Sequence, residues 1–248
     1  MAPELTRPYQ LRTSDFDRFG RIQPAAVLDI FQDVASIQAE DIGIGFDDMQ
    51  AQGVFWAIVR AKYEVLRQPI VHSTVLVRTW PHSPSRFAFQ RDYSMADESG
   101  DLLVKGSSEW VLMDVASRKL APVLEHYSGP RDFCEDRAFP RKLRKIHDLA
   151  EEDEEAVQSE RLIVPGASDI DVNGHVNNAR YAAYVLDALD ELGLAPSESV
   201  RTFQMDFRHE VRAGEKLRVA VARIGDTGAF AKGTGLSGEA SFACSIGL

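Results

Sequence analysis

An internal repeat limits the possible folds of this chain more than any other feature of its sequence. Residues 14–24 read SDFDRFGRIQP, and residues 168–178 read SDIDVNGHVNN. At a constant offset the two segments share a serine, two aspartates and a glycine, and the match continues without a gap to Asp33 and Asp187. Self-similarity at one offset is typical of a duplicated structural unit. We therefore expect two halves with the same fold.

Each half is expected to contain a strand, a turn, a long helix and then several strands. In the first half, residues 24–43 carry apolar residues at helical spacing and end at Gly43. Residues 54–123 then carry β-branched and aromatic runs between turn-like segments, which is typical of an antiparallel meander. The second half repeats this order with a strand, a helix and three later strands at residues 161–167, 178–193, 201–212, 216–225 and 228–236.

A long helix packed against an antiparallel sheet, present twice, predicts the α+β fold class. The two sheets are expected to join edge to edge into one extended sheet, because such pairing covers exposed strand edges. We predict an N-terminal half at residues 1–135, a charged and partly helical connector at residues 136–158, and a C-terminal half at residues 159–248. The connector contains an acidic cluster that runs from Glu151 to Glu155.

The composition excludes several classes of protein. With 44% hydrophobic and 27% charged residues the chain reads as globular, and no segment approaches the roughly 20 apolar residues that span a bilayer. The first residues lack an apolar signal core, so a cytoplasmic location is expected. Cys134 and Cys244 lie far apart without CxxC spacing, so neither a disulfide nor a metal site is predicted, and no cofactor is expected.

The net charge of −10 argues against nucleic acid as a partner, because phosphate binding depends on lysine and arginine. A local exception is the segment RKLRK, in which Arg141, Lys142, Arg144 and Lys145 occupy five positions. This run is either a docking patch for an anionic partner or a solvated part of the connector. The sequence leaves both interpretations open.

The two copies of the repeat differ in their polar residues. At matched positions the second copy carries an amide, an imidazole and a carboxylate where the first carries an aromatic ring, a guanidinium and an alkyl group. Two copies kept for structure alone would use polar groups similarly. The asymmetry therefore predicts a single reactive centre in the C-terminal half. Two pairs lie in the repeated turn, Asn173 with Phe19 and His175 with Arg21, and a second matched block, AKYEVLRQP with MDFRHEVRA, pairs Glu210 with Leu66.

These residue types suit the chemistry of a carbonyl group with water as the nucleophile. His175 is a candidate acid, base or hydrogen-bond donor, since imidazole has an ordinary pKa of about 6.5. Glu210 can remove a proton from water, and Asn173 can orient a carbonyl group or a water molecule. Asn177 or Asn178 is expected to cap the following helix, whose N-terminus would favour an oxyanion.

A structural interpretation of the same residues stays open. The sequence DVNG forms a good turn on its own, so Asp171, Asn173 and Gly174 could serve backbone geometry only. Glu210 could be an exposed strand residue paired with Arg208 or Arg212. No GxSxG elbow, phosphate-binding loop, dinucleotide fingerprint or HExxH motif is present, so no motif supports a covalent serine or phosphate chemistry.

The segment SDIDVNGHVNNARYAAYVLDAL resembles the acyl-acyl carrier protein (ACP) thioesterases, a double hotdog family of plants and bacteria. The family pattern Asp-x-Asn-x-His-Val-Asn-Asn-x-(Lys/Arg)-Tyr is met from Asp171 to Tyr181. The segment MDFRHEV resembles the family's acidic-aromatic-Arg-x-Glu segment, and GVFWAIVRAKYEV, VRTWP and SSEWVLMDVASRKLAPV resemble its first hotdog. The likeness extends from about Leu11 to Gly225.

The resemblance implies a tandem hotdog in which the first half binds the acyl chain and the second half hydrolyses the thioester. It implies no cofactor and a partner, an ACP that carries the acyl thioester on 4′-phosphopantetheine. Plant members usually have cysteine directly after the glutamate, but Val211 stands there, so an active protein cannot require a thiol at that position. The implied catalytic set is Asp171, Asn173, His175 and Glu210, with Asn177, Asn178, Phe55 and Trp56 as substrate contacts.

Two alternatives remain on the same scaffold. One is an acyl-CoA thioesterase, and the other is a non-catalytic acyl-binding hotdog module. The sequence does not decide between Glu210 and Asp171 as the group that activates water. It also does not give the preferred acyl chain, or whether the protein is a monomer or a homodimer.

Overall fold

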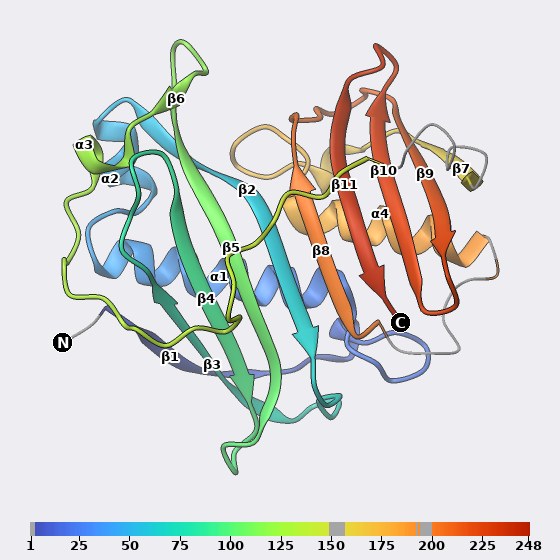
Figure 1. Ribbon diagram of the computed structural model, residues 1–248, viewed down its shortest axis with the longest axis horizontal. Helices are drawn as coiled ribbons and strands as arrows, with labels where there is room; N and C mark the ends of the chain where they lie inside the picture. Colours follow the sequence, from blue (N-terminus) through green and yellow to red (C-terminus); the bar gives the residue numbers. More distant parts are fainter. Residues whose placement is uncertain (1–2, 149–156, 192, 194–199) are drawn as a thin grey trace. The chain divides into compact units, whose positions relative to one another are not determined.

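The computed structural model describes residues 3–148, 157–191, 193 and 200–248 (Figure 1). The chain divides into two compact units, one made of Met1–Ile22 and Asp29–Leu143, the other of Gln23–Leu28 and Arg144–Leu248. The change from the first unit to the second falls inside the predicted connector at residues 136–158.

In the first unit, five antiparallel strands form a sheet in the order β1-β3-β4-β5-β2, and the short β6 pairs with β5. The predicted helix and meander are both present. The elements are β1 (Leu5–Gln10), the 3₁₀ helix η1 (Thr13–Asp15), α1 (Pro24–Asp41), α2 (Phe46–Ala51), β2 (Val54–Val65), β3 (Thr74–Pro81), β4 (Phe89–Ala96), β5 (Leu102–Asp114), β6 (Leu120–Ala121) and α3 (Val123–His126).

Helix α1 packs against one face of this sheet and lies behind β4 and β5 in Figure 1. The ring of Phe31 stacks on Tyr93 of β4 at a centroid distance of 4.6 Å. Gly106 of β5 permits this close packing, because a Cβ there would meet the Phe31 ring at 2.4 Å. An aromatic ring at position 93 and a glycine at position 106 therefore fit the buried face of α1 against the sheet.

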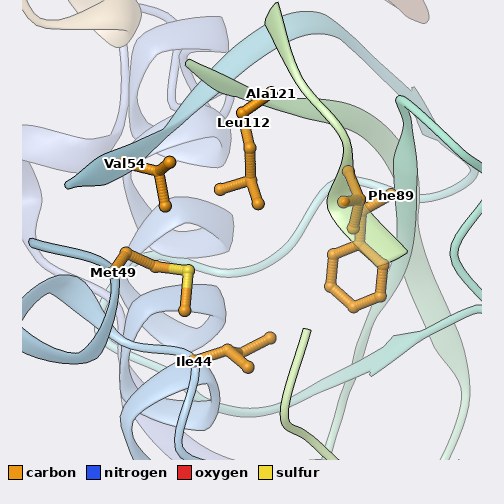
Figure 2. Close-up of a cluster of buried hydrophobic side chains, with 7 residues drawn as sticks. Ile44, Met49, Val54, Phe89, Leu112 and Ala121 are labelled. Carbon is orange, nitrogen blue, oxygen red and sulfur yellow. The ribbon is translucent and has the colours of Figure 1, made fainter. Parts of the chain in front are cut away.

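A second part of this core lies where α2, β6 and α3 meet the sheet, and Figure 2 shows its buried side chains. Met49 of α2 and Val123 of α3 are almost fully buried. These short elements close the end of the core that α1 alone would leave open. The cluster consists of Ile44, Met49, Val54, Phe89, Leu112, Ala121 and Val123.

In the second unit, five antiparallel strands form a sheet in the order β8-β11-β10-β9-β7. Helix α4 packs on it through Tyr181, whose ring lies 5.3 Å from Phe242 and 6.1 Å from Phe207. The α+β fold class is confirmed. The elements are β7 (Val157–Ile163), the 3₁₀ helix η3 (Ala167–Asp169), α4 (Asn178–Glu191), β8 (Thr202–Phe207), β9 (Leu217–Ile224), β10 (Gly228–Gly235) and β11 (Ala240–Gly247).

The predicted helix in the connector is absent from its described part, residues 136–148, which contains neither helix nor strand. The backbone of this segment bonds to sheet side chains instead. The Ala138 N–H donates to Asp92 of β4 at 2.9 Å, and the Ile146 N–H donates to Asp206 of β8 at 2.7 Å. Backbone groups engaged in this way cannot form helical bonds. The acidic cluster lies outside the described residues.

None of the helices in the described residues is both long enough and apolar enough to span a bilayer.

Candidate active site

The second copy of the repeated turn is held by its own backbone. The Asp171 N–H donates to the His175 carbonyl at 2.9 Å, and the Gly174 N–H donates to the Asp171 carbonyl at 3.0 Å. Gly174 adopts φ +80°, a left-handed conformation that glycine reaches without a steric cost. The Asp171 carboxylate also accepts the Asn173 N–H at 2.9 Å. The turn therefore presents Asn173 and His175 from a closed loop.

Helix α4 begins directly after this turn, and Asn177 is its N-cap. The Asn177 side-chain oxygen accepts the Ala179 N–H at 2.9 Å, which satisfies one of the donors left open at a helix start. Asn178 is the first helical residue. Of the two asparagines that the sequence offered as caps, the structure selects Asn177.

His175 and Glu210 are brought together in the second unit. The His175 Nε2 and Glu210 Oε2 atoms are 2.8 Å apart, which is a hydrogen-bonding distance. The His175 side chain is 13% exposed and the Glu210 side chain 43% exposed. Because a carboxylate only accepts, we assign the ring proton to Nε2. An oriented imidazole and a solvent-accessible carboxylate are therefore joined in one pair.

Two contacts hold the segment that carries Glu210. The Val176 N–H donates to the Val211 carbonyl at 2.8 Å, which ties this segment to the end of the turn. The phenol of Tyr181 also bonds the Val211 backbone, and burial raises the pKa of that phenol. Neither contact involves a residue that the sequence had assigned to the site, because the pattern of apolar positions does not tell which backbone a buried phenol will meet.

Asp171 has one carboxylate oxygen that is not used by the turn. Its Oδ1 accepts the Asn173 N–H, whereas Oδ2 bonds no other group among the described residues. Asp171 is partly exposed and Asn173 is exposed, so both can meet a substrate or water. The four predicted catalytic residues thus all lie in the turn at 171–175 or in the segment tied to it.

Asp169 and Arg180 support the turn from the side of the helix. The two side chains are 2.8 Å apart, and Asp169 also accepts the Gly166 N–H at 2.9 Å. Burial acts against the charged form of Asp169, but the Gly166 N–H and Arg180 hold its pKa below the usual range. Asp169 was visible in the sequence as a repeated aspartate and Arg180 as the Lys/Arg position of the family pattern, but their pairing was not.

The predicted substrate contacts in the first unit have clear structural roles. The Trp56 Nε1–H donates to the Ile44 carbonyl at 2.9 Å, and its ring stacks on Phe89 at 5.3 Å, beside the cluster in Figure 2. The Arg118 guanidinium lies 5.0 Å from the Phe55 ring centroid. Contact of either ring with a substrate stays a prediction.

Family models match both halves of the chain. The Acyl-ACP thioesterase N-terminal domain matches residues 4–130, and the Acyl-ACP thioesterase C-terminal domain matches residues 151–238. The chain belongs to the acyl-ACP thioesterase family. The resemblance found in the sequence is confirmed, and the predicted catalytic residues of this thioesterase family member all fall in the part that matches the C-terminal domain.

The curated relatives that the chain matches carry names from the same family. The chain is 26% identical to oleoyl-acyl carrier protein thioesterase 1, chloroplastic, from Arabidopsis thaliana, over 81% of the chain and 59% of that protein. It is also 26% identical to dodecanoyl-[acyl-carrier-protein] hydrolase, chloroplastic, from Umbellularia californica, over 78% of the chain and 52% of that protein. The chain therefore spans little more than half the length of these relatives.

Solved structures confirm the double hotdog fold. An acyl-ACP thioesterase from Bacteroides thetaiotaomicron superposes with a TM-score of 0.87 at 21% identity, covering 99% of this chain and 97% of that one. The 12:0-ACP thioesterase from Umbellularia californica superposes with a TM-score of 0.86 at 20% identity, covering 100% and 97%. The family fold extends over the chain from end to end.

Proposed function

We propose that this protein hydrolyses fatty acyl-ACP to a free fatty acid and holo-ACP, with water as the nucleophile. The observation that carries the proposal is the 2.8 Å contact of His175 Nε2 with Glu210 Oε2, beside the start of α4. Family membership adds that relatives are named as oleoyl- and dodecanoyl-ACP thioesterases or hydrolases. No cofactor enters the proposal.

In this mechanism Glu210 is the general base. Its carboxylate is 43% exposed, so water can reach it, and the bond from His175 fixes its orientation. The water oxygen bonds to the thioester carbonyl carbon while its proton passes to Glu210. When the tetrahedral intermediate collapses, the C–S bond breaks and the pantetheine sulfur takes that proton. The products are the fatty acid and the free thiol, and the carboxylate is regenerated.

The turn supplies the groups that stabilise negative charge on the carbonyl oxygen. Asn173 is exposed and carries an amide N–H₂ that can donate to an oxyanion. The N-terminus of the 14-residue helix α4 adds a positive dipole end next to the same turn. The free Oδ2 of Asp171 is the second acceptor for the attacking water. Each of the four side chains thus has a separate role.

The family resemblance adds a further part to the proposal. The fatty chain is proposed to bind in the N-terminal half, residues 1–135, with Phe55 and Trp56 as contacts. The boundaries 136–158 and 159–248 remain predictions for the connector and the catalytic half. Oligomeric state, monomer or homodimer, is left to measurement.

The test is turnover of acyl-ACP by Glu210→Gln and His175→Ala variants. We expect kcat to fall about 10²- to 10⁴-fold, as is usual when a general base or its partner is removed, with an unchanged Tm. The second unit offers a matched control, because His209 and Glu239 form an exposed histidine–carboxylate pair at 3.1 Å. His209→Ala and Glu239→Gln should keep wild-type kcat. Wild-type rates in the Glu210 and His175 variants would refute the site.

The same assay separates the alternative functions. An acyl-CoA thioesterase would show a kcat/KM on acyl-CoA equal to or above that on ACP with the same acyl group. A non-catalytic module would bind fatty acyl groups stoichiometrically and release no thiol. The proposal requires thiol release and a higher kcat/KM on ACP.

A further inference from the structure

The described connector carries a cationic surface that the proposed mechanism does not use. The side chains of Arg141, Lys142, Arg144 and Lys145, called the basic segment below, are all exposed. Within the part of the chain that the structure describes, none of them forms an ion pair. On a chain with a net charge of −10, four neighbouring free cations form a local exception that calls for an anionic partner.

The C-terminal part of this segment is anchored in the second unit, so the backbone that carries Arg144 and Lys145 is held in place. The Arg144 carbonyl accepts the Gln204 side-chain N–H at 2.7 Å, and the Ile146 N–H donates to Asp206 at 2.7 Å. The Arg208 guanidinium donates to the Ile146 carbonyl at 3.1 Å. Within the second unit, Figure 1 shows the described connector from residue 144 onward crossing in front of β8, on the sheet face opposite α4. A fixed backbone lowers the entropic cost of binding through its side chains.

The acidic groups next to this anchor are already neutralised. Asp148 pairs with Arg208 at 2.7 Å and with Lys232 at 3.2 Å. Burial acts against the charge of Asp148, but these two cations hold its pKa below the usual range. Asp206 is buried and accepts the connector N–H. The described carboxylates around the anchor therefore do not cancel the exposed charges of Arg144 and Lys145.

The distance from this surface to Glu210 suits a tethered thioester. Gln204, which holds the Arg144 carbonyl, is six residues before Glu210, so even fully extended chain separates them by at most about 22 Å. A phosphopantetheine arm has about fourteen bonds between its serine oxygen and its sulfur, the length of nearly five extended residues or about 16 Å. The side chain of Arg144 adds its own reach. The upper bound on the Gln204–Glu210 separation is thus comparable to the length of the arm together with one arginine side chain.

From these observations we infer that the basic segment is the docking surface for the carrier protein, which it binds through the acidic residues around the phosphopantetheine-bearing serine. Acyl carrier proteins are strongly acidic, so the charges are complementary. Complementary surface charges raise the association rate and make it depend on salt. The inference rests on the proposed function and adds the surface by which the enzyme recognises its substrate.

The test compares two substrates that share one acyl group, acyl-ACP and acyl-pantetheine. In Arg144→Glu/Lys145→Glu, KM for acyl-ACP should rise about tenfold or more with little change in kcat, and the salt dependence of kcat/KM should weaken. Turnover of acyl-pantetheine should not change. Adding Arg141→Glu and Lys142→Glu should increase KM for acyl-ACP further.

A control variant removes the effect of total charge. Arg7 and Lys119 are exposed cations of the first unit, and Arg7→Glu/Lys119→Glu changes the net charge by the same amount. This control should leave KM for acyl-ACP near the wild-type value. The docking surface is refuted if the control raises KM as much as the basic-segment variant, or if both substrates are affected equally. If the wild-type protein hydrolyses neither substrate, the proposed function itself fails.

Discussion

The two copies of the repeated turn, residues 14–24 and 168–178, have the same backbone and different side-chain chemistry. In each copy an isolated β-bridge closes the turn and a glycine takes a positive φ, +73° in the first and +80° in the second. Three equivalent hydrogen bonds differ in length by at most 0.1 Å between the copies. In the first copy they join Asp17 N to Arg21 O (2.8 Å), Gly20 N to Asp17 O (3.0 Å) and Phe19 N to Asp17 Oδ1 (2.8 Å). In the second copy they join Asp171 N to His175 O (2.9 Å), Gly174 N to Asp171 O (3.0 Å) and Asn173 N to Asp171 Oδ1 (2.9 Å).

The side chains of the first copy satisfy one another. The Asp17 carboxylate binds the Phe19 and Arg21 N–H groups with Oδ1 and the Arg21 guanidinium with Oδ2, at 2.9 Å. The Phe19 ring lies under the guanidinium groups of Arg18 and Arg21, at 5.0 and 4.5 Å. Both carboxylate oxygens of Asp17 are thus used within the turn itself.

The second copy leaves its polar atoms available. Among the described residues Asp171 Oδ2 has no bonding partner, and the His175 side chain bonds Glu210. The comparison shows that a turn built from aspartate and glycine sets the backbone geometry in both copies, and our proposal assigns the chemistry to the three positions at which their side chains differ.

The largest effect is expected when the second copy is given the side chains of the first. The triple variant Asn173→Phe/His175→Arg/Glu210→Leu keeps the turn backbone but places an arginine beside Asp171, as in the first copy. We expect kcat on acyl-ACP to fall at least about 10⁴-fold, because the base and its partner are both lost. A circular dichroism spectrum like that of the wild type would show that the fold is intact. Measurable residual turnover above about 1% would contradict the assignment of the chemistry to these positions.

A smaller effect should separate the two aspartates. Asp171→Asn retains an acceptor for the Asn173 N–H but removes the charge, and we expect kcat to fall about tenfold to a hundredfold with little change in Tm. Asp17→Asn removes the ion pair with Arg21 and should cost about 1 kcal/mol or less of unfolding free energy, with kcat unchanged. Steady-state kinetics and urea unfolding of both variants measure this contrast. Equal losses of kcat would mean that the copies are not functionally distinct.

Substitution of the two turn glycines should reduce the unfolding free energy equally but affect kcat differently. Gly20→Ala and Gly174→Ala each force a side chain into the left-handed region, at a cost of about 1–2 kcal/mol. Nothing lies within 4 Å of either added Cβ, so the cost comes from the backbone alone. Only Gly174→Ala should lower kcat, since it moves Asn173 and His175. Unequal unfolding free energies would show that the two backbones are not equivalent.

The smallest change in stability and activity is expected for substitution of Phe19, which is 57% exposed and occupies the position that Asn173 has in the second copy. Phe19→Ala removes only surface contacts with Arg18 and Arg21, so the unfolding free energy should change by about 0.5 kcal/mol or less. Thermal unfolding and acyl-ACP turnover together test this prediction. A fall in kcat would assign the first turn a part in the reaction.

The sequence was sufficient for the repeated frame, because aspartate and glycine at fixed spacing act through local backbone bonds. The asymmetry of the copies also singled out His175 and Glu210, whose catalytic role stays a prediction and whose 2.8 Å contact depends on how β8 is placed. Local pattern could not choose between Asn177 and Asn178 as the helix cap. Local pattern also could not show that residues 136–148 of the partly helical connector would contain no helix, because the partners of their backbone are sheet side chains far away in the sequence.

The connector has one further consequence. Ala138 is fastened to Asp92 of the first unit and Ile146 to Asp206 of the second, so each unit retains a separate attachment on its own side of the junction. If the chain were cut between those two residues, each new chain end would still be hydrogen-bonded to a buried carboxylate. The protein could therefore be expressed as two polypeptides divided in this interval. Halves from different family members could then be combined.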